Sequence, residues 1–401
     1  RLWANAILSS AEYAASARFR YEAGGSSYSP LAAFTLNGDP DIDIPGYWPN
    51  RAQQGWKEST KEPYYHPEWG ILDGEYIDSF EHDGLISNYR QEHFAFTDHP
   101  LTFDKAQKRP VLPHIFASYD FTRWVAEDVH ALGKYSIGNS VLVRWAFPAH
   151  LFDIMGCERN WILNGQFYPD QDSLLNLWRT FSYHKPYCVL QTSSVPAFDH
   201  EMVEDYFGVC AFYGIYPSFF SHDGGDTNYW EQPQWYERDR DLFIKYIPKI
   251  IALNEAGWEP ITGARSGHPR VYVERYGNGN EFYLTLRNVA GDDLDTVISV
   301  DLDELGLGTS EGCAAQEWLT DSAVPVTPTE GGVSLALQIP AESTRIVCLE
   351  FSDSPISDTR SVELTGGWNL VSLPGMPLSS QPDELFASID GQIDQAYVYD
   401  A

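Results

Sequence analysis

The amino-acid sequence predicts an α/β protein: a (β/α)8 TIM-type barrel followed by an all-β sandwich and a truncated third module. Up to about residue 262, short apolar runs of strand character alternate with amphipathic helical stretches, which is typical of a parallel sheet with crossover helices. The segments after several of these runs are long and rich in Trp, Tyr, His and carboxylates, as are the loops at the carboxyl ends of barrel strands. Helical spacing ends near residue 265. We therefore expect the barrel at residues 1–262, the sandwich at 265–352 and the third module at 360–401.

Six segments have the length and apolar content of barrel strands. They are Phe19–Ala23, Glu75–Ser79, Tyr135–Asn139, Phe152–Gly156, Tyr187–Thr192 and Ile215–Phe220. Helices are expected at Leu2–Ala17, Phe121–Leu132, Ser173–Tyr183, Glu201–Phe212 and Tyr236–Ala256. A complete barrel has eight strands. Either one or two strands therefore precede Arg1 in a longer protein, or one irregular strand escapes recognition.

The predicted sandwich begins with two strands, Val271–Tyr276 and Glu281–Asn288, on either side of the turn Gly277–Asn280. Further strands are expected at Thr296–Val300, Val333–Ile339 and Thr344–Phe351. A linker rich in Ser, Pro and Asp then leads from Ser352 to Asp358. This change of pattern predicts that an all-β domain follows the barrel.

The composition excludes several classes of protein. Asp and Glu number 57 against 26 Lys and Arg, a net charge of −31 that repels a phosphate backbone, so we expect no nucleic-acid partner. No run approaches the roughly 18 apolar residues of a membrane span. The five cysteines lack the spacing of a zinc site or a disulfide framework, and no Gly-rich dinucleotide fingerprint or GxSxG elbow is present. We expect no metal and no organic cofactor. An aromatic content of 14% suits a protein that stacks rings on sugar faces.

Two carboxylates, Asp78 and Glu158, follow predicted strands and are the candidate catalytic residues. The strand period of two places Tyr76 and Asp78 on one face and Glu75 on the other. Cleavage of a glycosidic bond uses two carboxyl groups that flank the bond. The structural alternatives are a helix cap for Asp78 and an ion pair with Arg159 for Glu158. Three other carboxylates remain open as replacements: Glu75, Glu81 and Asp153.

Ten residues are candidates for contacting the substrate, because they are polar or aromatic and lie in or near the predicted loops. They are Tyr76, Trp69, Arg90, His93, Tyr119, Asn139, Trp145, Trp161, His222 and Asp223. Packing in the core is the alternative for each aromatic residue. A helix cap is the alternative for Asn139, and a solvent-facing polar position is the alternative for His93. For His222 and Asp223 the alternative is a polar turn, because the oxygen ligands clustered there lack the spacing of a calcium loop.

Three motifs, DGEYIDSF (Asp73–Phe80), ALGKYSIGN (Ala131–Asn139) and FDIMGCERNW (Phe152–Trp161), resemble strands four to six of retaining (β/α)8 glycoside hydrolases. The broad relatives are α-galactosidase-like barrels and the endo-α-N-acetylgalactosaminidase type. This resemblance implies that Asp78 is the nucleophile and Glu158 the general acid/base. Glu75 departs from the pattern, which usually has an aliphatic residue at this position facing the helices.

Two further stretches resemble parts of such proteins. GWEPITGARS (Gly257–Ser266) is similar to the passage from such a barrel to its C-terminal β-sandwich. GWNLVSLPGMPL (Gly367–Leu378), which precedes a predicted helix at Pro382–Ile389, resembles the start of a module appended to exported bacterial and archaeal proteins.

The sequence therefore predicts a fragment of a secreted O-glycosyl hydrolase, located outside the cell or at its surface. Its expected partner is an oligosaccharide, a polysaccharide or a glycoconjugate, and its expected mechanism uses two carboxylates with retention of configuration. The alternative is a catalytically inactive barrel that binds glycans or acts as a cell-surface scaffold, because both proteins would keep the aromatic loops.

Overall fold

The chain divides into two compact units, Arg1–Ile356 and Ser357–Ala401. The computed structural model describes residues 18–22, 28–32, 38–43, 52, 55–65, 72–81, 87–105, 108–193, 195–219, 229–307 and 312–351, all in the first unit. The expected helix Leu2–Ala17, the linker Ser352–Asp358 and the third module lie outside the described residues.

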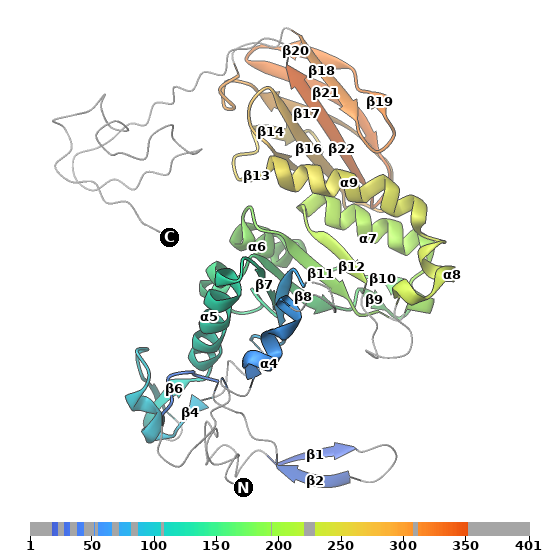
Figure 1. Ribbon diagram of the computed structural model, residues 1–401. Coiled ribbons are helices and arrows are strands. Elements are labelled where there is room, and N and C mark those ends of the chain that lie inside the picture. Colours follow the sequence, from blue (N-terminus) through green and yellow to red (C-terminus); the bar gives the residue numbers. More distant parts are fainter. Residues whose placement is uncertain are drawn as a thin grey trace, which may run out of the picture. The chain divides into compact units, whose positions relative to one another are not determined.

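A five-stranded parallel sheet forms the centre of the first part of this unit (Figure 1). Its strands follow one another across the sheet in chain order: β3 (Gly74–Ile77), β7 (Tyr135–Asn139), β8 (Ile154–Arg159), β11 (Tyr187–Gln191) and β12 (Tyr216–Phe219). Every neighbouring pair is parallel. Five of the six predicted barrel strands therefore belong to this sheet, with boundaries shifted by one or two residues at most of their ends.

The crossovers between these strands are mainly helical. They are α5 (Ile115–Ala131), η3 (Phe147–Leu151), α6 (Asp172–Ser182) and α7 (His200–Tyr213), and α9 (Arg240–Ala256) follows the last strand. Side chains on the helix-facing side of the sheet, such as Met155 and Val189, are fully buried with these helices in one apolar core. Ile137 and Leu190, which point to the opposite face, are only partly buried. The helices therefore cover one face of the sheet.

The predicted eight-stranded barrel is not what the described residues form, because their parallel sheet is open and has five strands. The predicted strand Phe19–Ala23 is formed as β1 (Arg18–Glu22), but it pairs antiparallel with β2 (Tyr28–Ala32) in a separate two-stranded sheet. Antiparallel neighbours can be joined by a short loop, whereas parallel neighbours need a long crossover. β1 therefore pairs with β2, its near neighbour in the chain, and does not join the parallel sheet.

The long segment after β3, expected as a loop, contains a small antiparallel sheet in the order β4–β6–β5. Its elements are β4 (Ser87–Asn88), η2 (Gln91–Ala95), β5 (Thr102–Asp104) and β6 (Arg109–Pro113). The remaining short elements are α4 (Glu58–Lys61), η1 (Glu62–Tyr64), β9 (Ile162–Leu163), β10 (Gln166–Phe167), η4 (Val195–Ala197), η5 (Tyr229–Glu231) and α8 (Pro233–Tyr236).

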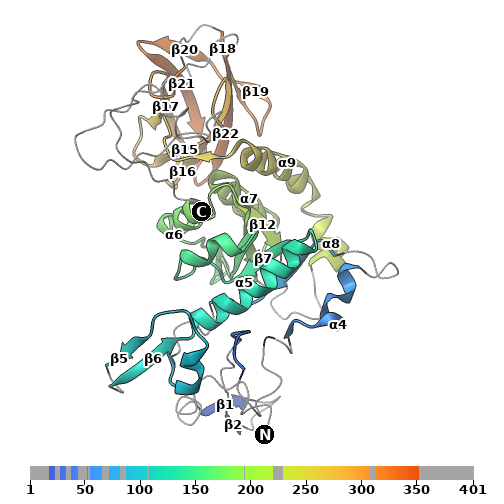
Figure 2. The ribbon, with the colours of Figure 1, turned by 60° about the vertical axis from the view of Figure 1, so that its left-hand side comes forward.

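Two antiparallel sheets follow α9 in the chain (Figure 2). The two sheets share one apolar core. The six-stranded sheet contains β13 (Trp258–Glu259), β15 (Val271–Tyr276), β16 (Glu281–Asn288), β22 (Thr344–Phe351), β18 (Cys313–Glu317) and β19 (Ser322–Ala323). The four-stranded sheet contains β14 (Ala264–Ser266), β17 (Leu294–Asp301), β21 (Gly332–Ile339) and β20 (Val326–Thr329). The five strands expected here from the sequence are all present.

The six-stranded sheet is buried on both faces along β16 and β22. Phe282 and Leu284 point into the core shared by the two antiparallel sheets, whereas Tyr283 points into the core shared with the helices. Hydrogen bonds join this second face to α7: Thr285 Oγ1 donates to the carbonyl oxygen of Phe212 (2.9 Å), and Thr344 Oγ1 donates to that of Gly208 (2.8 Å). The antiparallel sheets and the helical layer are therefore packed as parts of one unit.

Candidate functional site

The carboxyl ends of three adjacent parallel strands bring the candidate catalytic residues together. Ile77 of β3 pairs with Gly138 of β7, so Asp78 follows in register with Asn139, the last residue of β7. Asn139 in turn pairs with Gly156 of β8, and Glu158 lies two residues farther along that strand. Because side chains two residues apart share a face, and laterally paired residues of a sheet point the same way, these three side chains emerge on one face.

The amide of Asn139 joins the two candidate carboxylates. Its Nδ2 donates to Oδ1 of Asp78 (2.7 Å) and to Oε1 of Glu158 (2.9 Å). Its Oδ1 accepts a hydrogen bond from the backbone N–H of Ser140 (2.8 Å), which fixes the amide group with its two N–H donors towards the carboxylates. Asn139 is only 1% exposed, whereas Asp78 and Glu158 are exposed. A buried neutral donor therefore holds two solvent-facing carboxylates.

The shared nitrogen limits how far apart the carboxylates are. The oxygens that accept from Nδ2 can be separated by no more than the sum of the two bond lengths, about 5.6 Å, and a separation of roughly 5 Å results if the two N–H groups diverge by the usual angle of about 120°. Carboxyl groups of retaining glycosidases lie about 5–5.5 Å apart, and those of inverting glycosidases about 6.5–9.5 Å. The two accepting oxygens are therefore closer to each other than the separation given for inverting glycosidases.

The backbone next to this pair adopts unusual conformations. Ser79, directly after Asp78, has φ 54°, and Ser140, directly after Asn139, has φ 57°. Neither residue is glycine, so each left-handed conformation costs on the order of 1–3 kcal/mol. The backbone N–H of Phe80 donates to the carbonyl oxygen of Asn139 (3.0 Å) and ties the two turns together. Such strained positions persist only where the surrounding structure enforces them, and they cluster at functional sites.

Tyr76 completes the cluster on the same face of β3. Its side chain is 45% exposed, and burial together with the negative charges of Asp78 and Glu158 raises the pKa of its phenol. The phenol therefore stays protonated at all ordinary pH values and can donate a hydrogen bond beside the two carboxylates.

A cavity of about 470 Å³ opens next to Glu158. Trp161, Asp170 and the exposed Tyr168 also line it. Arg159 forms its ion pair with Asp170 (Nε to Oδ2, 2.6 Å), which leaves Glu158 in contact with Asn139 instead of Arg159.

The β9–β10 hairpin, which leads to Tyr168, was missed by sequence reasoning. Its turn is Asn164-Gly165, with φ 53° and 74°. An Asn-Gly pair is a strong hairpin signal, and here it separates the short segments Ile162–Leu163 and Gln166–Phe167, so the sequence did contain the information needed to expect this element.

The three alternative carboxylates are engaged elsewhere. Glu75 points to the other face of β3 and accepts a hydrogen bond from the hydroxyl of Tyr64. Glu81 is fully buried, and its two oxygens accept from the backbone N–H groups of Val143 (3.1 Å) and Arg144 (2.7 Å). Burial raises the pKa of Glu81.

Asp153 lies at the opposite end of β8 from Glu158, and its Oδ2 accepts from the backbone N–H of Ser136 (2.7 Å). Burial raises its pKa, but this hydrogen bond and that from His130 lower it overall. β8 pairs with β11 in unbroken register from Met155 to Arg159, so no bulge in this part of the strand turns Asp153 towards the face that carries Glu158.

Several candidate substrate-binding residues are buried or make contacts within the chain. His93 is fully buried with its Nδ1 near Nδ2 of Asn88 (3.1 Å), and burial lowers its pKa to about 4. Arg90 pairs with Glu92 (3.3 Å) in the same small sheet region. Trp161 is 2% exposed, with its indole nitrogen donating to Asp170 (2.8 Å), so its ring offers no free face for a sugar.

The remaining candidates are placed as follows. Tyr119 lies on α5, where its hydroxyl contacts Nε2 of His150 (3.2 Å) and its ring packs near Phe147. Trp145 is partly buried against the helical core. Trp69, His222 and Asp223 lie outside the described residues.

Within the described residues, no set of three or more His, Cys, Asp or Glu side chains is arranged to hold a metal ion. No helix in this part of the chain is both long and apolar enough to cross a membrane. All five cysteines are free thiols.

Comparison with known proteins gives similarity of structure but not of sequence: no family model and no curated protein matches the chain. Similar solved structures include a GH30 endoxylanase from Clostridium papyrosolvens C71 (11% identity, 84% of this chain and 77% of that chain covered, TM-score 0.37). A GH27 β-L-arabinopyranosidase from Geobacillus stearothermophilus has 10% identity, coverage of 83% and 87%, and a TM-score of 0.37.

A rhamnosidase from Novosphingobium sp. PP1Y has 8% identity, coverage of 62% and 41%, and a TM-score of 0.44. These three similar structures are glycoside hydrolases, but none of their TM-scores reaches 0.5. At this level the likeness assigns neither a family nor an activity, which must be inferred from the site itself.

Proposed function

We propose that this protein is a glycoside hydrolase that cleaves O-glycosidic bonds of an oligosaccharide, polysaccharide or glycoconjugate with retention of configuration. The observation that carries the proposal is the pair of hydrogen bonds from Asn139 to Asp78 and Glu158, which keeps the two accepting oxygens no more than about 5.6 Å apart. This supports a retaining mechanism, for which the two carboxyl groups lie about 5–5.5 Å apart. The acidic, lysine-poor composition supports an extracellular enzyme.

We infer from the hydrogen bonds of Asn139 which carboxylate oxygen acts in each step of the proposed mechanism. Among the described residues, Asn139 engages Oδ1 of Asp78 and leaves Oδ2 to attack the anomeric carbon. Asn139 likewise engages Oε1 of Glu158, so the acidic proton resides on Oε2 and passes to the leaving oxygen as its bond to the anomeric carbon breaks. In the second step Oε2 takes a proton from water, the water oxygen bonds to the anomeric carbon, and Asp78 is released.

Two single substitutions test the assignment. Asp78→Asn and Glu158→Gln should each lower kcat by about 10²–10⁴-fold on a panel of α- and β-linked aryl glycosides, because each removes one of the two essential carboxyl groups. Glu158→Gln should lose least on dinitrophenyl glycosides, whose leaving group needs no protonation. Glu127→Gln, an exposed carboxylate on α5, is the matched control and should keep full activity.

Product analysis separates the possible outcomes. Proton NMR of the first-formed sugar should show the anomer of the substrate, and the opposite anomer would refute the retaining mechanism. Wild-type turnover in both Asp78→Asn and Glu158→Gln would refute the catalytic assignment. Glycan binding by the wild-type chain without hydrolysis of any bond would favour the binding protein over the enzyme.

A further inference from the structure

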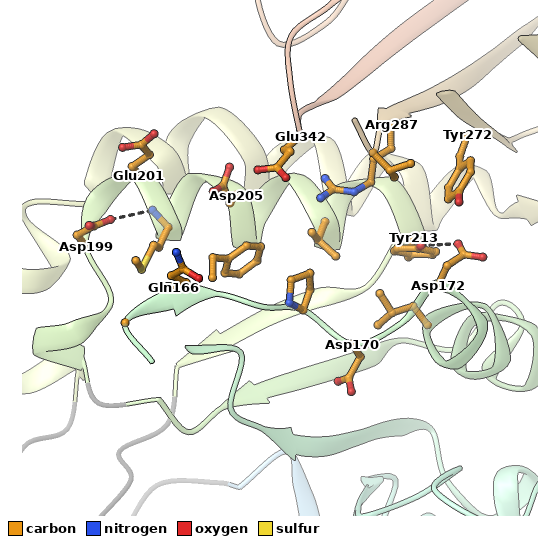
Figure 3. A pocket seen from close by; sticks show the side chains of 17 residues that line it. Gln166, Asp170, Asp172, Asp199, Glu201, Asp205, Tyr213, Tyr272, Arg287 and Glu342 are labelled. Atoms are coloured by element: carbon orange, nitrogen blue, oxygen red, sulfur yellow. Dashed lines mark hydrogen bonds between the residues drawn. The ribbon is translucent and has the colours of Figure 1, made fainter. Parts of the chain in front are cut away.

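A second cavity, of about 630 Å³, lies beside α7 (Figure 3). Its walls come from four parts of the chain that are distant in sequence: α7, the segment from Gly165 to Leu175, the strands β15 and β16 of the six-stranded sheet, and Glu342 in the loop before β22. The proposed catalytic residues do not line it. Its lining therefore has a chemistry of its own.

Arg287 of β16 is the single guanidinium in this lining. Its Nη1 donates to Oγ1 of Thr344 (3.2 Å), and no carboxylate in the described part of the chain lies within ion-pair distance of it. Figure 3 shows the guanidinium directed towards Glu342, with Asp205 of α7 beyond. Burial lowers the pKa of Arg287, although the charges of Asp205 and Glu342 oppose this effect. The N–H groups of Arg287, which is partly shielded from solvent, therefore face the cavity. The carboxylates of Asp205 and Glu342 lie nearby but do not contact them.

The charged groups that line the cavity indicate which class of ligand it can bind. Six carboxylates line the cavity together with the one guanidinium: Asp170, Asp172, Asp199, Glu201, Asp205 and Glu342. Three of them also have partners within the chain: Asp170 pairs with Arg159, Asp172 accepts from the hydroxyl of Tyr213, and Asp199 accepts from the backbone N–H of Met202. An anion would be repelled by this excess of negative charge, and a compact cation would have to sit beside Arg287. A neutral polyol satisfies both kinds of group, because each hydroxyl donates to a carboxylate and accepts from the guanidinium.

Aromatic surface is available in the same cavity. Tyr272 of β15 is 38% exposed and lies on the side of Arg287 away from Glu342 (Figure 3). Phe167 of β10 contributes a second partly buried ring. An amphipathic ring next to hydroxyl-binding groups suits the apolar face of a pyranose. A volume of this size is within the usual range for small-molecule sites.

Two residues connect this cavity with the one beside Glu158. Pro169 and Asp170 line both cavities, so the two are separated by a single stretch of backbone. The geometry points to a second, distal carbohydrate site in which Arg287, Asp205, Glu342 and Tyr272 bind neutral sugar residues of the glycan remote from the bond that is cleaved. The inference rests on the proposed function for the identity of that glycan as substrate.

Binding is measured in a variant whose hydrolytic activity is strongly reduced, so that the ligand stays intact during the titration. Glu158→Gln should bind at least one of maltohexaose, cellohexaose, xylohexaose and mannohexaose, as measured by isothermal titration calorimetry. In this background Tyr272→Ala should weaken binding roughly three- to tenfold through the loss of ring contact, and Arg287→Met roughly tenfold or more through the loss of charged donors. Tyr272→Phe keeps the ring and should bind nearly as well as its parent.

Tyr65→Ala removes a similarly exposed tyrosine outside the cavity and is the matched control. Unchanged binding in both Tyr272→Ala and Arg287→Met would overturn the inference, as would the absence of binding by all four hexasaccharides at millimolar concentration. Because Tyr272 lies on the surface, its substitution tests the site even if Arg287→Met fails to fold.

Kinetics with an otherwise wild-type chain separates this inference from the proposed function. Tyr272→Ala should raise KM for the hexasaccharide severalfold and leave the hydrolysis of aryl monoglycosides unchanged, because a single sugar does not reach the distal cavity. Equal loss on both substrates would overturn the distal site while leaving the hydrolase intact. Binding that depends on Tyr272 without any hydrolysis would refute the hydrolase but support the site.

Discussion

The carboxylate pair at the ends of β3 and β8 and the acidic lining of the cavity beside α7 hold negative charge in two different ways. Asp78 and Glu158 share one neutral donor, Asn139, at hydrogen-bond distance. Asp205 and Glu342 instead lie on one side of the cation Arg287 without forming an ion pair with it. The first arrangement fixes two oxygens relative to each other, and the second leaves donors and acceptors available to a ligand.

The difference follows from what supports each region. Asn139 is buried, lies at the end of a strand and is held in register by its neighbours on both sides. The groups around Arg287 stand on a helix, a strand and a loop, which are held together by packing between layers. Register places groups to within a fraction of an ångström, as bond-making requires, whereas packing between layers makes room for a molecule.

The largest effect on stability should come from breaking the buried ion pair that joins α6 to β15. Arg179 of α6 is buried, donates to Oε1 of Glu274 on β15 (2.9 Å) and stacks over the ring of Trp258. Arg179→Met leaves Glu274 without this partner, so the free energy of unfolding should fall by about 3–5 kcal/mol in chemical denaturation.

The double variant Arg179→Met/Glu274→Leu should recover much of that loss, because no uncompensated charge remains. The matched control is Lys245→Met, which breaks the partly exposed pair with Glu204 and should cost less than about 1 kcal/mol. A loss as small as that in Arg179→Met would show that the buried pair does not hold α6 to β15.

Removing the side-chain amide of Asn139 tests whether this group positions the carboxylate pair. Asn139→Ala should lower kcat by about 10–100-fold, because the two carboxylates lose the group that sets their separation. KM should change by less than about threefold, since the amide contacts the carboxylates and not the substrate.

The control for burial is Asn88→Ala, which removes a similarly buried asparagine from the small antiparallel sheet. It should reduce thermal stability by a comparable amount without the loss of kcat. A rise in KM with unchanged kcat in Asn139→Ala would assign this residue to substrate binding instead of to positioning.

The smallest effect is expected from a single carboxylate of the second cavity. Burial raises the pKa of Asp205 from 3.8 to about 6, so the folded state holds its proton more tightly than the unfolded state does. This carboxyl therefore destabilises the fold progressively as the pH rises from about 4 to about 6, and the full penalty applies above pH 6. Asp205→Asn should raise the free energy of unfolding at pH 7 by on the order of 1 kcal/mol, after discounting for solvent screening.

The pH dependence is the measurement that identifies this effect. The difference in melting temperature between Asp205→Asn and the wild-type chain should be present at pH 7 and nearly absent at pH 4. Glu201→Gln, an exposed carboxylate on the same helix, should show a much smaller difference between the two pH values. Equal stabilisation by Asp205→Asn at both pH values would rule out titration as its cause.

Local pattern was enough to predict the long helices and most of the longer strands in the described part of this protein. Strands Tyr135–Asn139, Val271–Tyr276, Glu281–Asn288 and Thr344–Phe351 begin and end where the sequence predicted, because alternation of apolar residues and turn signals are properties of neighbouring residues. The number of strands in the parallel sheet was not predictable in this way. Arg18–Glu22 has strand character, yet it pairs with Tyr28–Ala32, and such a choice of partner is not written in the strand itself.

In the candidate site, too, some features follow from the sequence and others depend on the tertiary structure. The sequence by itself determined that Tyr76 and Asp78 share a face of their strand, because side chains alternate with a period of two, and it determined that Glu158 follows an apolar run. Only the tertiary structure decided that Asn139 bridges the two carboxylates, that Arg159 pairs with Asp170, and that Asp205, Arg287 and Glu342 surround one cavity. Side-chain direction depends on the dihedral angles of adjacent residues, whereas contact between distant residues depends on how whole layers pack.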